Sequence, residues 1–537
     1  MSVKSSIIDR DSYWNLLYLT HGKRSYVFKK EGKNHEKNDE KCHKCILAIT
    51  FSTLIGCSSS TPDTTSPQSE DAPSEESANP SHIRMAFLYI GEEPADLQMV
   101  QDAVNKISID EINVEVEFVP ISLFQYGDQL NLMISGGEQL DVAAAFPSLS
   151  VLYSKGQLMP LDDLITEYGQ GLAEEVGQDY LNGCRLGGEI YGIPILCGFA
   201  YSSGLSYSVD LAEELGIDMS NVTSLDDLDA ILAEVHEKDP DIYAIAAKST
   251  SASLVNQMLT CDMLSDSIGV LMDPENGTTI ESLYETETYK QLALKVRDWY
   301  EKGYIMKDQA STSETLLSLI AADKAFCGIT NYTPGIEMEQ MSSTNGKRVK
   351  VIPLSDPLVS STSVSVSTMC IPITCSDTTA AMKFLNLLYT NAEVINLIDW
   401  GIEGVHYVKN EDGTIRYPDG VTAETSTYNI GTQFMNANEL LSYVWEGNDP
   451  NLWQEKVAFE ENAIASNALG FNFDSSSVKT QMTAVSNVIN QYEDALGNGT
   501  VDVESTLPQF IKALKDAGID DIITEKQKQF DEFLATK

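Results

Sequence analysis

The pattern of apolar and polar positions after residue 80 alternates between the period of a strand and the period of a helix. Residues 83–91 (IRMAFLYIG) form an apolar run, and residues 113–121 (NVEVEFVPI) alternate apolar with acidic side chains, so each segment predicts a strand. Between them, apolar residues recur at spacings of three and four over 94–107, which predicts an amphipathic helix. The order of strand, helix and strand indicates a parallel α/β sheet.

The same alternation continues along the chain. A predicted helix over 126–135, ended by Gly136 and Gly137, precedes a third predicted strand over 140–146 (LDVAAAF). The sequence contains no internal repeat and no coiled-coil heptad. Further predicted elements are a hairpin over 187–195, helices over 224–240, 289–302 and 507–514, and a hairpin turn at Asp412-Gly413.

A different pattern occurs near the N-terminus. The eleven residues 46–56 (ILAITFSTLIG) carry no charge. This run is shorter than the roughly 20 residues of a membrane-spanning helix but fits the apolar region of a signal peptide. Residues 1–56 contain ten Lys/Arg and six Asp/Glu, whereas the rest of the chain contains 25 and 74. A basic leader before an acidic body predicts that residues 1–56 are a removable signal peptide region.

The residues LIGC at 54–57 resemble the lipobox of bacterial lipoprotein signal peptides, in which the cysteine is acylated. The resemblance implies that Cys57 is lipidated and begins the mature chain. Residues 57–82 are rich in Ser, Thr, Pro and acidic residues, and we expect them to form a disordered tether. Because 45 residues precede the apolar run, we expect translation to start at a non-Met codon within 25–41.

Composition limits the size and the partners of the protein. The 537 residues are 42% hydrophobic, which suits about two to four domains. The net charge of -45 repels nucleic acid, so we expect no nucleic-acid partner. The pair Cys42 and Cys45 (CHKC) lies in the leader without a second pair and does not predict a zinc site. Six cysteines follow Cys57, and we expect them to be buried free thiols: Cys184, Cys197, Cys261, Cys327, Cys370 and Cys375.

Motifs for catalysis are missing from the sequence. The histidines after the leader, His82, His236 and His406, lack the spacing of a zinc peptidase, and no Walker A, G-x-S-x-G or G-x-G-x-x-G motif occurs. The 74 acidic residues after the leader generate carboxylate pairs everywhere, so they neither support nor exclude a glycosidase. We expect no catalytic residues, no metal site and no cofactor.

Five segments, in order, resemble the extracellular solute-binding proteins of ABC importers (family 1), and specifically the lipoprotein branch of Gram-positive bacteria. They span about residues 85–535. The segments are DQLNLMISGGEQLDVAAAF, GQLMPLDDLITEYG, GGEIYGIPI, AMKFLNLLYTNAEVINLIDWGIEGVHYV and the C-terminal region from LGFNFDSSSVKT to the end.

The resemblance implies a two-lobe periplasmic-binding-protein-like α/β fold of type II, with a multi-stranded hinge and the ligand cleft between the lobes. We expect lobe 1 to comprise residues 83–198 plus about 362–398. We expect lobe 2 to comprise residues 199–361 plus about 399–537, including a C-terminal extension. In open α/β sheets, ligands bind beyond the carboxyl ends of strands. The candidate ligand-binding residues are Tyr89, Glu92, Phe146, Ser148, Tyr201, Asn331, Tyr332, Trp400, Glu403 and Tyr407.

Aromatic faces beside Asn and Glu side chains suit a sugar, because rings stack on sugar C–H faces and carboxylates accept hydroxyl hydrogens. Only five arginines follow the leader, which favours a neutral oligosaccharide over a polyanion. A peptide or amino acid ligand and a surface glycan-degrading enzyme remain alternatives. The resemblance also implies ABC permease subunits as partners, a monomer, and a lipid-anchored position on the extracellular face of the cell membrane.

Overall fold

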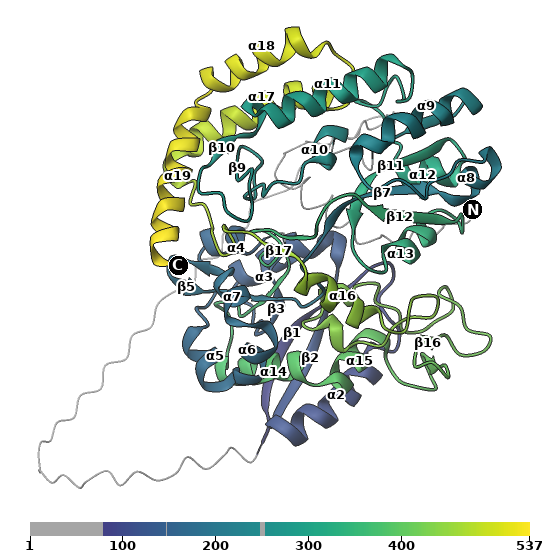
Figure 1. Ribbon diagram of the computed structural model, residues 1–537. Helices are drawn as coiled ribbons and strands as arrows, with labels where there is room; N and C mark the ends of the chain where they lie inside the picture. Colours follow the sequence, from purple (N-terminus) through teal and green to yellow (C-terminus); the bar gives the residue numbers. More distant parts are fainter. Residues whose placement is uncertain (1–78, 147, 248–252) are drawn as a thin grey trace, which may run out of the picture. The chain divides into compact units, whose positions relative to one another are not determined.

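The computed structural model describes residues 79–146, 148–247 and 253–537 (Figure 1). The predicted signal peptide region, the predicted lipidation site Cys57 and most of the predicted tether lie outside these residues. None of the helices in the described ranges combines the length and the apolar character that a bilayer crossing requires.

The first lobe is built on strands that run in parallel, as predicted. β1 (Ser81–Tyr89) pairs in parallel with β2 (Val114–Ser122) along its whole length, and Met85 forms a parallel bridge with Val142 beside β3. β14 lies antiparallel between β3 and β6. The other strands of this lobe are β3 (Ala143–Ala144), β4 (Arg185–Leu186), β5 (Glu189–Ile190), β6 (Ile193–Pro194) and β14 (Thr368–Cys370).

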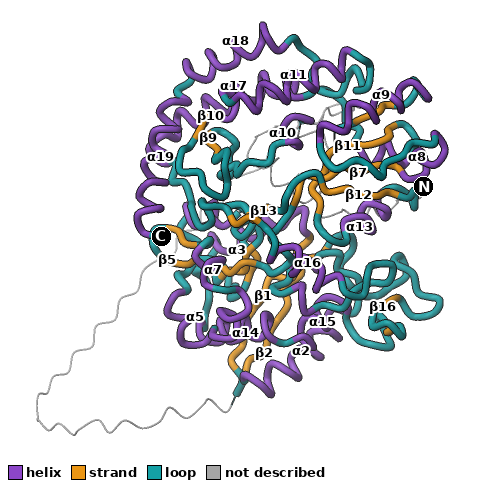
Figure 2. Tube along the Cα trace, viewed as in Figure 1, coloured by secondary structure: helices purple, strands orange, loops and turns teal. Residues whose placement is uncertain are grey.

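Helices pack on this sheet with the apolar faces that the periodicity predicted. In α2, the buried residues include Leu97, Val100 and Val104. Figure 2 shows α2, α14 and α15 near β1 and β2, and α14 also contacts α5 and α6. The helices of the first lobe are α2 (Leu97–Ile112), α3 (Tyr126–Ser135), α4 (Leu149–Ser154), α5 (Asp162–Tyr168), α6 (Gln170–Val176), α7 (Gln178–Asn182), α14 (Thr378–Thr390) and α15 (Ala392–Trp400).

The second lobe contains a four-stranded sheet in the order β12-β7-β11-β8. β8 and β11 are parallel, whereas β7 is antiparallel to both β11 and β12. The strands are β7 (Ser202–Ser208), β8 (Tyr243–Ile245), β11 (Ala325–Tyr332) and β12 (Val349–Pro353). The helices are α8 (Val209–Leu215), α9 (Leu228–Lys238), α10 (Leu254–Met258), α11 (Glu287–Glu301), α12 (Leu316–Ala321) and α13 (Ile336–Ser343).

The C-terminal extension packs on the second lobe. Its helices contribute Val485, Phe510 and Ile522 to the same apolar cluster as Trp299 of α11. In Figure 1 these helices are coloured yellow-green to yellow, and α17 lies beside α11. The extension consists of α17 (Lys479–Gly497), α18 (Val503–Asp516) and α19 (Ile519–Thr536), next to the short strands β9 (Gly269–Val270) and β10 (Glu281–Ser282).

The chain passes between the two apolar clusters through segments around residues 196–201, 354–358 and 464–478. Tyr201 and Leu358 exchange two backbone hydrogen bonds of 3.1 and 2.8 Å. β13 (Leu358–Val359) then pairs in parallel with β17 (Ile464–Ala465). The crossings are therefore held together as one small sheet, which we call the hinge ladder.

Membership of the two buried apolar clusters can be compared with the predicted lobe boundaries. The first cluster contains residues from Ile83 to Ala200 and from Val359 to Ile398, close to the expected lobe 1. It also contains Tyr428, Ile430, Met435 and Ala437, which lie in the segment that we expected in lobe 2. Backbone bonds from Ile90 to Ile430 and from Asp96 to Thr427 hold this segment against the end of β1. The boundary near residue 399 stays a prediction.

The six cysteines of the described residues are free thiols, and all but Cys375 are buried, as predicted. The predicted third strand is shorter than expected, because only Ala143 and Ala144 pair with β14. The hairpin turn at Asp412-Gly413 is confirmed between β15 (Val408–Lys409) and β16 (Ile415–Arg416).

Asp141, at the start of the third predicted strand, is fully buried and joins three parts of the first lobe. Its carboxylate accepts hydrogen bonds from the backbone N–H groups of Arg84 (2.7 Å) and Ser376 (2.6 Å) and from the Gln139 amide (2.8 Å). Burial raises the pKa of this carboxyl, but the backbone hydrogen bonds outweigh it and hold the pKa below its usual value.

We expect Asp141→Asn to lower the free energy of unfolding by roughly 2–4 kcal/mol, because an amide NH₂ then faces backbone donors. The stabilisation from Asp141 is present above the carboxyl's unfolded pKa and is lost as the pH falls through its lowered folded pKa. Urea unfolding at pH 7 measures the difference. Glu138→Gln in the same loop is the control and should change stability by about 0.5 kcal/mol or less; equal effects would contradict the assignment.

Candidate functional site

Sheet topology brings several of the predicted residues to the edge of the first lobe from which the hinge ladder begins. β3 and β6 both run antiparallel to β14 and so run parallel to each other and to β1. The carboxyl ends of β1, β3 and β6 therefore share one edge, and the first crossing follows β6. Tyr89 ends β1 and is half-buried, Glu92 follows it and is exposed, and Ser148 caps α4 through a bond from the Val151 N–H.

Phe146 follows β3 at the same edge, but its side chain packs inward. It is 4% exposed, and its ring lies edge-on to Tyr126 with 6.2 Å between centroids. Phe146 therefore belongs to the core of the first lobe and shapes the edge from below.

The second lobe brings Tyr201, Asn331 and Tyr332 to one end of its sheet, where the side chains of the consecutive strand residues Asn331 and Tyr332 point to opposite faces. Tyr332 ends β11 and is in register with Ser202, and Asn331 is in register with Ser203. Since Tyr201 belongs to the hinge ladder, these side chains lie where the second sheet meets the crossings. Asn331 is exposed and Tyr332 is half-buried.

A helix that the sequence did not single out, α16 (Leu452–Glu461), lies against both the crossings and this edge. The ring of Phe459 meets Tyr332 edge-on at 5.5 Å between centroids. The Lys456 ammonium bonds to the Cys197 carbonyl at 3.3 Å and lies 4.8 Å from the centroid of the Trp453 ring. One helix thus presents two aromatic rings and a buried cation next to the hinge ladder.

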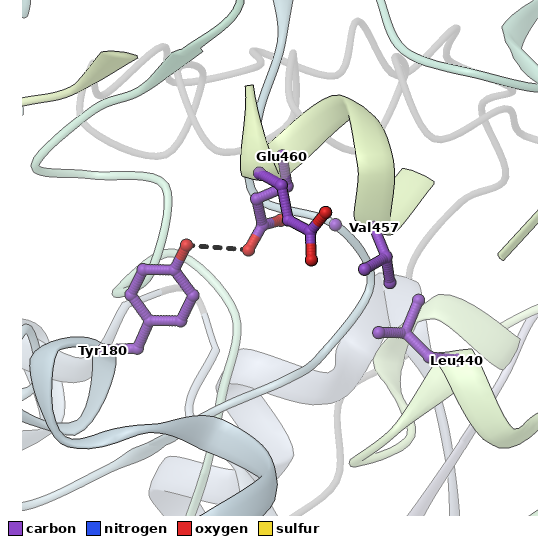
Figure 3. A pocket seen from close by; sticks show the side chains of 6 residues that line it. Tyr180, Leu440, Val457 and Glu460 are labelled. Atoms are coloured by element: carbon purple, nitrogen blue, oxygen red, sulfur yellow. Dashed lines mark hydrogen bonds between the residues drawn. The ribbon is translucent and has the colours of Figure 1, made fainter. Parts of the chain in front are cut away.

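Figure 3 shows a small hollow beside the first crossing, where Glu460 of α16 faces Tyr180 of α7. The Glu460 carboxylate accepts hydrogen bonds from the Tyr180 hydroxyl (2.7 Å) and from the Phe199 N–H (2.6 Å). Burial and this carboxylate raise the pKa of Tyr180, so the phenol stays a donor. The cavity measures about 170 Å³, whereas ligand pockets typically measure about 300–1,000 Å³, so it has room for only part of an extended ligand. The hollow is lined by Tyr180, Gly198, Leu440, Val457, Glu460 and Glu461.

Trp400 lies in an aromatic cluster that continues to α16. Its ring stacks on Trp445 with 5.2 Å between centroids, and Tyr417 meets Trp445 edge-on at 4.6 Å. Ser442 joins the cluster to α16, because its hydroxyl accepts the Trp400 indole N–H (2.8 Å) and its carbonyl accepts that of Trp453 (2.5 Å). Trp400 is half-buried, so part of its surface is accessible.

Glu403 and Tyr407 differ in accessibility. Glu403 is exposed and pairs with Lys409 at 3.1 Å. Tyr407 is 5% exposed and packs against Tyr443, and burial raises its pKa to about 12. Glu403 is thus available to a ligand in solution, whereas Tyr407 supports the turn from beneath.

The turn between α15 and Tyr407 depends on His406, which is buried. Its Nδ1 accepts the Ile402 N–H at 2.9 Å, so the ring proton is on Nε2, which lies 3.2 Å from the Asp96 carboxylate. Gly401 makes this possible: it has φ +78, and an added Cβ would lie 2.3 Å from His406 Nδ1. The turn is thereby tied to the loop after β1.

Asp399 is a second buried carboxyl beside the Trp400 cluster. The Asn436 amide donates to it at 2.8 Å. Burial raises its pKa to about 8, so it is mostly protonated at neutral pH. No group of three or more His, Cys, Asp or Glu side chains in the described ranges is arranged to hold a metal ion.

The sequence reasoning missed Tyr180, Glu460, Trp453 and Trp445. The two tryptophans share one signal, the aromatic-rich segment ELLSYVWEGNDPNLW at 439–453, where turn residues separate them, whereas Tyr180 and Glu460 lie outside this segment. A segment of this composition is typical of a surface that presents rings rather than of a core helix.

Comparison with protein families identifies two matching regions. The model of the bacterial extracellular solute-binding proteins matches residues 102–401. A domain of unknown function (DUF3502) matches residues 467–535, the C-terminal extension.

Individual proteins are similar over most of the chain. A carbohydrate ABC transporter substrate-binding protein of Streptococcus pneumoniae serotype 4 is 28% identical over 454 residues, which cover 83% of this chain and 90% of that protein. The crystal structure of the N-glycan transport solute binding protein (NgtS) from Streptococcus pneumoniae has a TM-score of 0.75 at 26% identity, covering 85% of this chain and 99% of that one. The NgtS complex with Man5GlcNAc has a TM-score of 0.63 at 26% identity, with the same coverage. The fold is thus the predicted two-lobe α/β architecture of type II.

We expect Gly401→Ala to lower the free energy of unfolding by roughly 2–4 kcal/mol, since it combines a strained backbone with a clash at His406. Gly404→Ala is the matched control: it also has a positive φ, of +80, but an added Cβ there meets nothing within 4 Å. It should cost only about 1 kcal/mol. Denaturant unfolding of both variants tests this, and equal losses would contradict the role of His406.

Proposed function

Since the chain belongs to the family of bacterial extracellular solute-binding proteins, we propose that it captures an oligosaccharide and delivers it to the permease subunits of an ABC importer. The observation that carries this proposal is a row of partly accessible rings that begins at the hinge ladder and continues along α16 to the Trp400 cluster. Tyr332 and Phe459 stand at one end of the row and Trp453, Trp400 and Trp445 at the other.

The chemistry of this row suits sugars. Aromatic faces bury the C–H surfaces of pyranose rings, and Asn331 and Glu403 are exposed polar groups that pair with hydroxyls. Several rings in sequence favour a ligand of more than one sugar unit. The similarity to NgtS, which has been solved with Man5GlcNAc, supports the same ligand class.

Within this proposal, the predicted residues take two roles. The accessible ones contact the ligand, whereas Phe146 and Tyr407 shape the site from beneath because they are buried. The contacting residues are Tyr89, Glu92, Ser148, Tyr201, Asn331, Tyr332, Trp400 and Glu403.

We expect Tyr332→Ala to weaken oligosaccharide binding roughly tenfold, because the ring that stacks on the sugar is lost. Tyr332→Phe keeps the ring and should bind within about threefold of the parent. Tyr168→Ala on α5 is a control for general aromatic loss. Calorimetry with a panel of neutral glycans and peptides measures the affinities, and saturable binding of peptides alone would overturn the ligand class.

The proposal describes a binder and not an enzyme. Mass spectrometry of the glycan after prolonged incubation should therefore recover it unchanged. Turnover of the glycan would show that the protein acts as a surface enzyme instead.

We also propose that Cys57 anchors the protein to the outer face of the cell membrane, with the acidic segment that follows as a tether. Tethering raises the effective concentration of the binder near its permease. Cys57→Ala should move the protein from the membrane fraction to the medium, whereas Cys375→Ala should leave its location unchanged. Cell fractionation, with mass spectrometry of acylated Cys57, tests the anchor; a membrane-bound Cys57→Ala variant would contradict it.

A further inference from the structure

The third crossing does not pass directly from the hinge ladder into the C-terminal extension. Residues 467–474, which we call the strap, follow β17 after Ser466 and precede α17. Hydrogen bonds and apolar contacts join the strap to elements of both lobes outside the hinge ladder. The strap forms the first residues of the region matched by the domain of unknown function.

On the first lobe, the strap is fixed by Asn472. Its side-chain amide donates hydrogen bonds to the backbone carbonyls of Gly183 (3.3 Å) and Arg185 (3.1 Å), in the turn between α7 and β4. Cys184, in the middle of this turn, is fully buried in the first apolar cluster. Leu469 of the strap packs against the same cluster. One end of the strap is therefore attached to the body of the first lobe.

On the second lobe, the strap is fixed by Asn467. Its N–H donates to the Pro274 carbonyl at 2.6 Å and its side-chain amide to the Gly277 carbonyl at 3.0 Å. Ala468 and Phe471 are buried in a separate apolar cluster whose second-lobe members include Leu271. The other end of the strap is therefore attached to residues 271–277 of the second lobe, which precede β10.

The last helix holds the strap in this position. The Phe471 ring meets Phe530 of α19 edge-on at 5.2 Å. Lys526 of α19 is fully buried and bonds to the Asp266 carboxylate (2.7 Å) and to the Gly269 carbonyl (3.1 Å) of the second lobe. A buried ion pair with a further hydrogen bond fixes one orientation of the helix. The extension consequently moves with the second lobe and carries the strap with it.

We propose that the strap is a brace that restricts the separation of the two lobes. The hinge ladder permits rotation, because only short strands connect the lobes. Any rotation that moves the α7–β4 turn away from residues 274–277 must break the Asn472 hydrogen bonds or remove the Phe471 side chain from its buried apolar cluster. The C-terminal extension thereby sets how far the ligand-free protein opens, a role that does not depend on the identity of the ligand.

The test measures the distance between the lobes by electron paramagnetic resonance, with spin labels at Asp110→Cys in the first lobe and Glu237→Cys in the second. Both positions are exposed. The full chain is used, with Cys42, Cys45, Cys57 and Cys375 replaced by serine so that only buried native thiols remain in the described residues. In ligand-free protein, Asn472→Ala should raise the ratio of long-distance to short-distance populations roughly tenfold, since two hydrogen bonds are lost.

Asn462→Ala is the matched control, because within the described residues the amide of Asn462, which follows α16, bonds to the Ala458 carbonyl of that helix and not to either lobe. It should leave the distance distribution unchanged. Asn467→Ala removes the side-chain hydrogen bond to the Gly277 carbonyl and keeps the backbone bond to Pro274, so it should shift the distribution in the same direction as Asn472→Ala by a smaller factor. The proposal thus stays testable if one variant folds poorly. Distributions identical to the parent in both strap variants, or an equal shift in the control, would overturn the brace. Neither outcome depends on oligosaccharide binding.

Discussion

Backbone pairing in the hinge ladder is the constraint on which the rest of the structure depends. Tyr201 and Leu358 exchange hydrogen bonds, and β13 extends this pairing to β17. The three crossings are therefore hydrogen-bonded to one another and do not act as independent linkers. Because β6 and β7 flank the first crossing, the carboxyl edge of the first sheet and the Tyr332 edge of the second both end at this unit.

The functional elements are arranged around that unit. α16 contacts the first crossing through Glu460 and the second sheet through the neighbouring residue Phe459, so this helix links the ring of Tyr332 to the hinge. The strap links the two lobes on the C-terminal side of β17, where the third crossing leaves the hinge ladder. Solute-binding proteins of two lobes depend on controlled closure, and this chain provides both a ring-lined edge at the hinge and a brace that limits opening.

The sequence predicted the local elements well because their signals are local. Helix α3 has the predicted bounds and α11 lies within two residues of its prediction, whereas α2 begins three residues later and ends five residues later than predicted. The parallel pairing of β1 and β2 follows from the strand, helix and strand order. Gly401 also has a local cause, because it leaves room for His406. Asp141 does not, because its backbone donors Arg84 and Ser376 are 57 and 235 positions away. Long-range placement was harder. Residues 428–437 join the first cluster because they cap the end of β1, and nothing in their own spacing indicates it.

The sequence by itself determined the α/β class, the acidic surface, the free thiols and most of the aromatic and polar residues now proposed to bind the ligand. Periodicity and composition carry this information, since each depends on neighbouring residues. Only the tertiary structure decided that Phe146 and Tyr407 face inward, that α16 and Tyr180 meet at the first crossing, and that Asn472 bonds to the α7–β4 turn. These contacts join residues up to about 290 positions apart, and a side chain's direction at such a contact depends on packing that no local pattern encodes.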